Sequence, residues 1–343
     1  MIHYLVTREH PYTINEYLAD WGRALQPRFE ILFYDDLVRR KSLQRGVYIF
    51  SDLERLNPPY MELAQNAFDA LNAAGGCVLM NDPSKVLRRR DMLHALNRAG
   101  KNPFRAHSVD AEFSAVRFPV FIRQDNEHDG AMTALLHSCE ELSAALRSIR
   151  GRQIPDDNLL MVEYFNTADA SGVFRKFGAF RVADQIIPRH ILLSGNWLLK
   201  YPDRVDPATV EEERNYLTSN PHHDQLRQIF EIAHIDYGRI DYSLRGGEVV
   251  TWEINTNPTI SVEPRSLSPL RQPLQPLFMD NFAKAFISLN TFSSSDPIPF
   301  STTADLIRRC KLRRRDRAFA AAKKNLRRVG RRLKRALRGS DHR

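Results

Sequence analysis

The chain has 343 residues, of which 43 % are hydrophobic and 27 % are charged, a composition typical of a globular protein of about two domains. Its formal net charge of +9 is uneven, because residues 301–343 hold 17 Lys plus Arg against 3 Asp, whereas residues 1–300 hold 33 against 38. No run of eighteen apolar residues occurs, and the three cysteines lie far apart. These features argue against a membrane span, a signal peptide and a disulfide framework, and they favour a cytoplasmic protein with reduced thiols.

The first 90 residues predict an amino-terminal α/β lobe. Four short apolar strands are expected, at residues 2–6, 30–34, 47–50 and 77–80. A capping box at Thr13 and Glu16 marks the start of one helix, and a second helix is expected over residues 58–74. Strands that alternate with helices are typical of a mostly parallel sheet.

Residues 91–165 predict a second, smaller lobe. A helix is expected near residues 90–100, and a buried strand then delivers Arg123 to its end. The loop that follows Arg123 holds three acidic residues and one glycine, and acidic side chains near a triphosphate are unfavourable unless they bind metal or point away. An Arg can hold a phosphate through its planar guanidinium group. A helix over residues 138–151 and a strand over 159–165 complete the lobe.

Residues 166–290 predict a third lobe built on long antiparallel strands. Strands are expected at 173–182, at 185–193 and near 197–200, followed by two helices, a hairpin and a closing helix. Lys176 belongs to a group of cations on these strands, and such a face suits polyphosphate or a substrate carboxylate.

Asp241, Glu253 and Asn255 are the predicted metal ligands, and they lie on the two strands of the hairpin. Both strands alternate polar and apolar side chains, which is typical of half-buried strands. If the two polar faces coincide, opposed side chains lie ~5 Å apart, with Arg239 beside them. Two carboxylates and an amide oxygen suit Mg²⁺ together with phosphate oxygens. A solvated hairpin whose polar face meets only water is the alternative.

The register of this hairpin decides whether the ligands converge. A two-residue turn at Gly246 and Gly247 would put Asp241 on the same face as Trp252 instead of Glu253, because a slip of one residue reverses the face of a strand. We therefore predict a β-bulge at the turn, with one of the two glycines in the left-handed conformation.

The segments Arg239-Ile240-Asp241 and Glu253-Ile254-Asn255 resemble the ATP-grasp superfamily, and the local match is nearest to the D-alanine–D-alanine ligase branch. The resemblance implies an ATP-grasp fold, in which an amino-terminal lobe precedes two lobes that clamp ATP. It also implies that Asp241, Glu253 and Asn255 hold two Mg²⁺ ions, with Mn²⁺ as the alternative, on the phosphates. Arg239 would then be catalytic, because it would stabilise the transferring phosphoryl group.

Other positions resemble the nucleotide site of the same superfamily. Arg123 stands where the family has a phosphate-binding Lys, and Lys200 resembles the Lys of a mobile loop that reaches the terminal phosphates. The resemblance therefore makes Lys200 both catalytic and nucleotide-binding. Residues 203–213 would be part of the lid that this loop forms.

Glu163, Tyr164 and Phe165 resemble the family's hinge, whose backbone reads the adenine edge and whose apolar side chains sandwich the ring. An ordinary core strand is the alternative. Met92 replaces a Lys that often reaches the nucleotide phosphates in the family, so that contact is missing or comes from a neighbouring Arg at residues 88–90.

The carboxy-terminal residues 291–343 predict a linker followed by a basic helical tail. Residues 291–303 are rich in Ser and Pro, and apolar residues recur at helical spacing over residues 306–338 among many cations. Such a helix suits an anionic membrane surface, which would place the protein at the membrane periphery, or an acidic partner, in preference to specific nucleic-acid binding. A disordered, solubilising tail is the alternative.

Together these features predict an ATP- and Mg²⁺-dependent ligase that activates a small carboxylate as an acylphosphate for attack by an amine. The ligation step comes from the family resemblance alone. A catalytically weak nucleotide-binding scaffold tethered by its tail, or an ATP-grasp kinase, are the alternatives. A protein whose tail binds nucleic acid is a third, and its binding should weaken steeply with salt.

Overall fold

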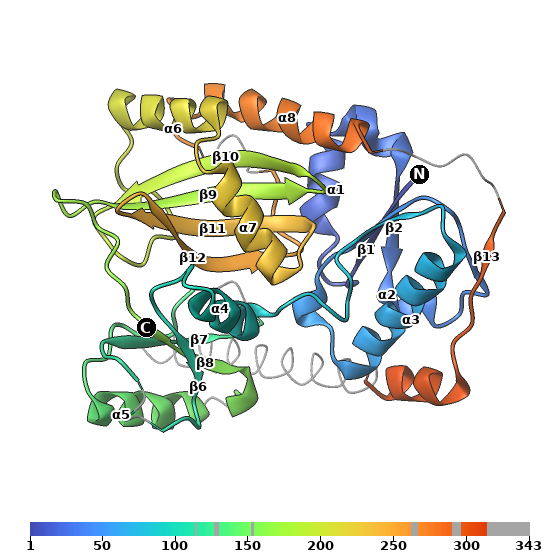
Figure 1. Ribbon diagram of the computed structural model, residues 1–343, viewed down its shortest axis with the longest axis horizontal. Coiled ribbons are helices and arrows are strands. Elements are labelled where there is room, and N and C mark those ends of the chain that lie inside the picture. The colour runs from blue at the N-terminus through green and yellow to red at the C-terminus, as the bar shows by residue number, and fades with distance from the viewer. Residues whose placement is uncertain are drawn as a thin grey trace, which may run out of the picture.

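The computed structural model describes residues 1–313 except 113, 115, 127–129, 152–153, 262–266 and 290–295. This part of the chain forms an amino-terminal α/β lobe, a small lobe and a large lobe, as Figure 1 shows. The predicted fold class, an α/β protein with a parallel sheet and two further lobes, is confirmed. The lobe boundaries at residues 90, 165 and 290 stay a prediction. None of the helices in the described part of the chain combines the length and the apolar composition of a membrane-spanning helix.

The amino-terminal lobe is built on a four-stranded parallel sheet in the order β2-β1-β4-β5. Its strands are β1 (Ile2–Val6), β2 (Phe29–Phe33), β4 (Val47–Phe50) and β5 (Val78–Met80). Its helices are α1 (Tyr12–Ala19), α2 (Tyr34–Leu37) and α3 (Pro58–Ala74). Two prolines at the start of α3 and the amide cap of Asn57 fix where that helix begins, and its apolar face packs on the sheet.

The small lobe is a three-stranded antiparallel sheet covered by one helix. The strands are β6 (Ala106–Ser108), β7 (Val120–Gln124) and β8 (Leu159–Glu163), in the order β6-β8-β7. Helix α5 (Cys139–Arg150) begins at Ser138, whose hydroxyl accepts a hydrogen bond from the backbone N–H of Glu141. The predicted cap at this helix is therefore confirmed.

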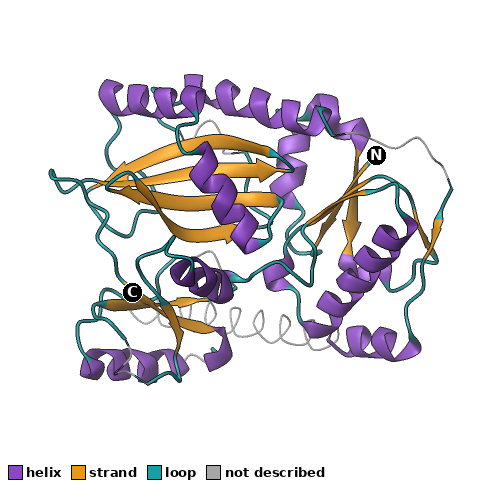
Figure 2. Ribbon diagram, viewed as in Figure 1, coloured by secondary structure: helices purple, strands orange, loops and turns teal. Residues whose placement is uncertain are grey.

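The large lobe is a four-stranded antiparallel sheet in the order β10-β9-β11-β12. The strands are β9 (Phe174–Val182), β10 (Gln185–Ser194), β11 (Tyr237–Arg245) and β12 (Glu248–Asn255). Its helices are α6 (Pro207–Ser219), α7 (His223–Ala233) and α8 (Gln275–Ile287), and α4 (Arg89–Arg98) packs against α7 and β12. Short 3-10 helices also occur in all three lobes, at Arg23–Arg28, Leu53–Arg55, Asp156–Asn158 and Gln272–Leu274. Figure 2 shows α7 lying over one face of this sheet.

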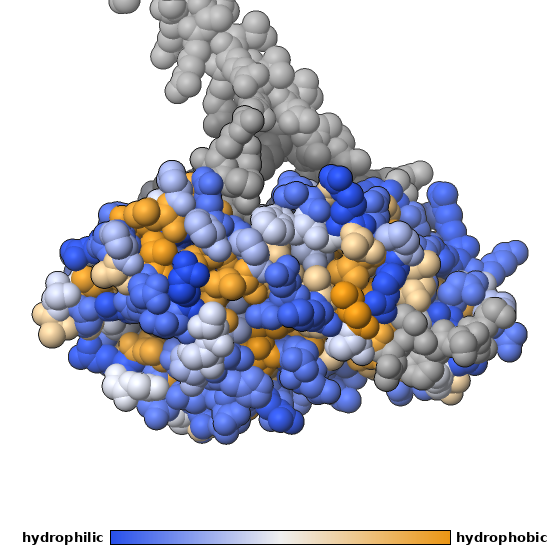
Figure 3. All heavy atoms as spheres, turned by 90° about the horizontal axis from the view of Figure 1, so that it is seen from above, coloured by the Kyte–Doolittle hydropathy of each residue, from blue (hydrophilic) through white to orange (hydrophobic). Residues whose placement is uncertain are grey.

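The amino-terminal and large lobes share a buried interface. Aromatic side chains of the amino-terminal lobe, such as Tyr4 and Tyr17, pack in one cluster with Phe180 and Phe282 of the large lobe. Asn81 adds hydrogen bonds from its side chain to the backbone at the start of β11. On the outer face that bears α6 and α8, hydrophilic side chains separate the hydrophobic patches (Figure 3).

The chain returns to the amino-terminal lobe after α8. Strand β13 (Ile298–Pro299) pairs with β3 (Ser42–Leu43), and residues 304–313 are helical. Ile298, Phe300 and Leu306 are buried in the same hydrophobic core as α3. Part of the predicted linker is therefore docked structure, because its apolar residues complete a core. Residues 314–343 lie outside the described residues, so the predicted binding of the tail to a membrane or an acidic partner stays a prediction.

Two local predictions are wrong. Thr13 does not cap α1. Its hydroxyl lies within hydrogen-bond distance of two acceptors instead, the backbone carbonyl of His10 and Oδ1 of Asn257, 2.6 Å away. The short strand near residues 197–200 does not form, and these residues belong to a loop after β10. In both places, contacts with distant residues replace the local pattern.

Candidate functional site

The β11–β12 hairpin has the register that brings its carboxylates together. Asp241 lies opposite Glu253, and Arg239 lies opposite Asn255, so all four side chains start from the same face of the sheet. The register shifts by one residue between Asp241 and Tyr242, so a β-bulge is present, as predicted. Its predicted position is wrong.

The bulge lies in the middle of β12, at Trp252, and not at the glycine turn. Gly246 and Gly247 both have positive φ and form a regular two-residue turn. Trp252 is the extra residue, and it lines the same cleft as Asp241 and Glu253. Its indole stacks on Phe104 with ring centroids 5.0 Å apart. This contact between distant segments accommodates the bulged side chain.

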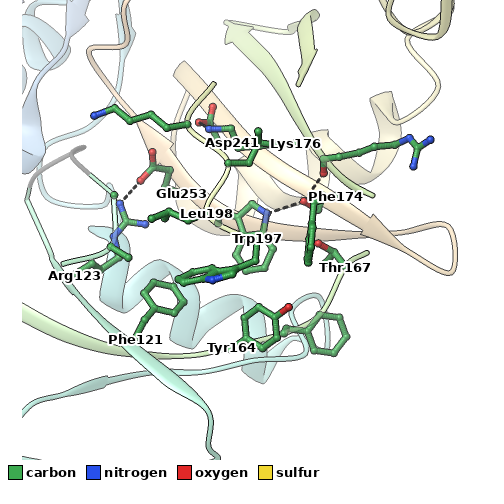
Figure 4. Close-up of a pocket in the computed structure, with 18 residues that line it drawn as sticks. Phe121, Arg123, Tyr164, Thr167, Phe174, Lys176, Trp197, Leu198, Asp241 and Glu253 are labelled. Atoms are coloured by element: carbon green, nitrogen blue, oxygen red, sulfur yellow. Dashed lines mark hydrogen bonds and ion pairs between the residues drawn. The ribbon is translucent and has the colours of Figure 1, made fainter. Parts of the chain in front are cut away.

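A cavity of about 230 Å³ opens between the small lobe and this face of the large lobe. One end is aromatic. Phe121, Tyr164 and Trp197 gather there, with ring centroids 5.1 Å apart for Phe121 and Trp197 and 5.8 Å apart for Tyr164 and Trp197 (Figure 4). Phe165, Phe174 and Trp252 also line the cleft. The aromatic end therefore suits a flat ring.

The other end of the cleft is charged. Its charged side chains are Arg123, Lys176, Lys200, Asp241 and Glu253. Arg175 also borders the cleft, but its guanidinium pairs with Asp169 and Glu212. Oδ2 of Asp241 lies 3.4 Å from Nζ of Lys176, and its Oδ1 lies 2.9 Å from Nε of Arg239. Oε2 of Glu253 accepts from Arg123 at 2.6 Å, as the dashed line in Figure 4 marks, and from Arg89 at 2.8 Å. Each carboxylate is thus held by two cations.

Arg89 is a candidate site residue that the sequence only partly located. Met92 is buried in the large-lobe core, so it does not reach the cleft, whereas Arg89 at the start of α4 points to Glu253. Arg89 also donates to the backbone carbonyls of Gln124 and Asp125. Burial, followed by repulsion from Arg123, lowers the pKa of Arg89 to about 10. From the sequence, Arg89 was one of three candidate arginines at residues 88–90. The sequence does not show which side of the helix will face a cleft formed by distant segments.

Glu163 does not face the cleft. Its buried carboxylate accepts hydrogen bonds from the backbone N–H groups of Arg105 and Arg117 and lies 3.1 Å from Nε2 of His107. Burial alone would raise the pKa of Glu163, but these hydrogen bonds together lower it to about 2. Its role is to hold the end of β8, so that Tyr164 and Phe165 enter the cleft.

Asn255 and Arg239 lie beside the cleft and do not line it. Oδ1 of Asn255 accepts from the backbone N–H of Asn257 at 2.8 Å, and Nη1 of Arg239 donates to the carbonyl of Thr259 at 3.3 Å. Lys200 lines the cleft from the exposed loop after β10. Among the residues that the structure describes, no three His, Cys, Asp or Glu side chains gather as a metal site. A hard cation would therefore need phosphate oxygens to complete the set of Asp241 and Glu253.

Neither a protein-family model nor a curated protein matches the sequence. Solved structures do resemble the chain. D-alanine–D-alanine ligase from Bacillus anthracis is 14 % identical, with 83 % of this chain and 95 % of that chain covered and a TM-score of 0.48. An ATP-grasp RimK domain protein from Sphaerobacter thermophilus is 14 % identical over 82 % and 99 %, with a TM-score of 0.42.

N5-carboxyaminoimidazole ribonucleotide synthetase from Thermus thermophilus is 16 % identical over 87 % of this chain and 81 % of that chain, with a TM-score of 0.47. These are ATP-grasp proteins. At these identities and TM-scores, no activity or substrate is transferred to this chain.

Proposed function

We propose that the cleft binds ATP with Mg²⁺ and that the protein is an ATP-dependent ligase, which activates a carboxylate as an acylphosphate for attack by an amine. One observation carries the proposal. A single cleft has an aromatic end and, at the other end, the facing carboxylates Asp241 and Glu253, each bound by two cations. This division matches a ligand with a flat ring at one end and a polyanion at the other.

The adenine ring would lie among Tyr164, Trp197 and Phe121. Stacking of a base on an aromatic side chain contributes about 1–3 kcal/mol. The triphosphate would then run toward Arg123, Lys176 and Lys200, the cations that line the far end. The exposed loop that carries Lys200 would act as a lid that excludes water.

Nucleotide binding would be an exchange of ionic partners. Arg89 and Arg123 now hold Glu253, and Lys176 holds Asp241. A triphosphate supplies oxygens for these cations, and the two carboxylates become available to a hard divalent ion, for which their oxygens are suitable ligands. Bound Mg²⁺ would neutralise charge on the β- and γ-phosphate oxygens.

The chemical step follows from charge placement. A substrate carboxylate oxygen would attack the γ-phosphorus, the bond to ADP would break, and Arg239 and Lys200 would stabilise the charge on the moving group. An amine nitrogen would then attack the acyl carbon of the acylphosphate, inorganic phosphate would leave, and the nitrogen would lose a proton. The sequence resemblance, and not the geometry, is the ground for the second step.

A nucleotide-binding scaffold is the second candidate, and one observation favours it. Glu253 is fixed by two guanidinium groups, and this arrangement neutralises a predicted metal ligand inside the protein. If this pairing persists with nucleotide bound, turnover would be weak. An ATP-grasp kinase would stop after the first step and release no amide.

Calorimetry with Mg-ATP on the full chain tests binding. Replacing Trp197 with Ala should weaken binding about fivefold or more, because the loss of one stacking contact costs at least about 1 kcal/mol. Trp21→Ala is the matched control, because Trp21 is an exposed indole outside the cleft. Absence of Mg-ATP binding by the unaltered protein would refute the proposal and the scaffold together.

ADP release in the presence of pooled amino acids, polyamines and cell-envelope carboxylates tests the chemistry. Lys200→Ala should lower kcat about 10²-fold or more, because a charge-stabilising donor is lost, and Lys41→Ala is the exposed control. Nucleotide binding without ADP release in any pool would favour the scaffold. Release of ADP with a phosphorylated acid as the end product would favour the kinase.

A further inference from the structure

A straight row of cross-strand neighbours crosses the large-lobe sheet. His190 on β10 lies opposite Gly178 on β9, which lies opposite Asp241 on β11, which lies opposite Glu253 on β12. Directly opposed side chains point to the same face of a sheet. His190 therefore shares a face with the two carboxylates of the cleft, although it lies two strands away from Asp241.

Gly178 leaves space for the His190 ring to lie across its strand. A Cβ atom at Gly178 would lie 2.7 Å from both Cε1 and Nε2 of His190. The imidazole therefore covers the position where any other residue would have a side chain, and its Nε2 edge extends over β9. Nε2 is shielded from solvent and has no hydrogen-bond partner in the described structure.

The surroundings of His190 are strongly cationic. Burial first, and then the positive charges of Arg239, Arg189, Lys176 and Arg271, lower its pKa well below the usual value. The imidazole is therefore neutral, and a shielded polar atom without a partner destabilises the structure. A ligand that accepts a hydrogen bond from Nε2–H would remove this destabilisation.

The carboxylates of this region are already committed to other cations. Asp241 forms ion pairs with Arg239 and Lys176, and Glu213 accepts two hydrogen bonds of 2.7 Å from Arg271.

Arg189 is left with neutral partners among the described residues. It is 4 % exposed, and it donates to the carbonyl of Ile260 at 3.2 Å and to Oε1 of Gln275 at 3.0 Å. Its guanidinium lies 4.5 Å from the ring centroid of Phe278. Burial, followed by repulsion from Arg239, lowers the pKa of Arg189 to about 9. Among the described residues, the carboxylate whose charge favours protonated Arg189 is Glu213, and Glu213 is itself bonded to Arg271. Within that same set, a buried positive charge without an ion pair of its own thus lies next to a polar atom, Nε2 of His190, without a hydrogen-bond partner.

We infer that Arg189 and His190 form a second anion subsite, which binds an oxyanion, either a carboxylate or a phosphoryl group, carried by the acid substrate. That the bearer is this substrate rests on the proposed function. The subsite adjoins the reacting end, because Arg239 and Arg189 bond the consecutive carbonyls of Thr259 and Ile260. An acid with one group at Arg239 and a second at Arg189 fits this pair. The substrate class is therefore an acid with a second anionic group.

The test is calorimetry on the full chain with two probes, succinate and inorganic phosphate, each with and without a Mg-bound non-hydrolysable ATP analogue. We expect at least one probe to bind, and we expect both His190→Asn and Arg189→Met to weaken that binding at least tenfold. Affinity for the ATP analogue should stay unchanged in both variants. Loss of succinate binding would identify a carboxylate subsite, and loss of phosphate binding a phosphoryl subsite.

Gly178→Ala provides a second variant that keeps the histidine. Its methyl group would displace the imidazole, so we expect the same loss of probe binding as in His190→Asn, and this result is decisive if Arg189→Met fails to fold. His223→Asn is the matched control, because His223 is an exposed histidine at the start of α7. The inference is overturned if neither probe binds, or if folded variants bind the probe like the unaltered chain. Failure to bind the ATP analogue would instead refute the proposed function.

Discussion

Replacing Glu253 with Gln would remove the carboxylate that Arg89 and Arg123 share. The side chains are 4 % exposed for Arg89, 11 % for Arg123 and 14 % for Glu253. Removing one partner of a buried ion pair costs about 3–5 kcal/mol, because the remaining charge is left without compensation. Arg89 keeps its hydrogen bonds to backbone carbonyls, so we expect a loss near 3 kcal/mol.

Equilibrium unfolding in urea, followed by tryptophan fluorescence, measures this loss. Asp156→Asn is the control, because the Arg150–Asp156 pair is exposed and its removal should leave the midpoint almost unchanged. Tripolyphosphate without metal should stabilise Glu253→Gln more than the unaltered chain, because its oxygens replace the lost carboxylate. A variant as stable as the unaltered chain, with no added response to tripolyphosphate, would refute the idea that Glu253 holds these cations.

Three further outcomes are expected. The pKa of Glu163 is lower in the folded protein than in the unfolded chain. Its contribution to stability is therefore present above the unfolded pKa near 4.5 and is lost as the pH falls toward the folded pKa of about 2. In Glu163→Gln, the melting temperature should therefore fall less steeply as the pH is lowered. Truncation to residues 1–303 should lower the stability of the amino-terminal lobe by about 2–3 kcal/mol relative to truncation to residues 1–313, since the shorter chain lacks the buried Leu306. Met92→Lys should destabilise by several kcal/mol in urea without strengthening Mg-ATP binding, because residue 92 is in the core.

The alternating pattern of the hairpin was sufficient to predict its strands, its polar face and the need for a bulge. Asp241 and Glu253 can face each other only if one residue is inserted into the register. The position of the insertion was not predictable, because it depends on Trp252 stacking against Phe104, far away in the sequence. Turn chemistry favoured a bulge at the two glycines, but the packing of the Trp252 indole on Phe104 places the bulge in the middle of β12.

Arg89, at the start of α4, shows a second limit of prediction from the sequence. A helical pattern predicts which residues share a face, but it does not say which cleft the exposed face will meet. Met92 has the sequence position of a family Lys, and Arg89, one turn earlier, is the side chain that reaches Glu253. Trp197 was missed for a related reason, because a strand was expected where an irregular loop turns its ring into the cleft.

The balance of charge explains why these cations and carboxylates occur together. Five cationic side chains face two carboxylates at the charged end of the cleft and beside it; they are Arg89, Arg123, Lys176, Lys200 and Arg239. A cleft with cations alone would repel a divalent ion, and one with carboxylates alone would repel a triphosphate. When both are present, the carboxylates and the cations bind each other in the free protein. The divalent ion can reach the carboxylates, and the triphosphate the cations, only when these ion pairs separate. Nucleotide and metal should therefore bind cooperatively, since each releases the partners that the other needs.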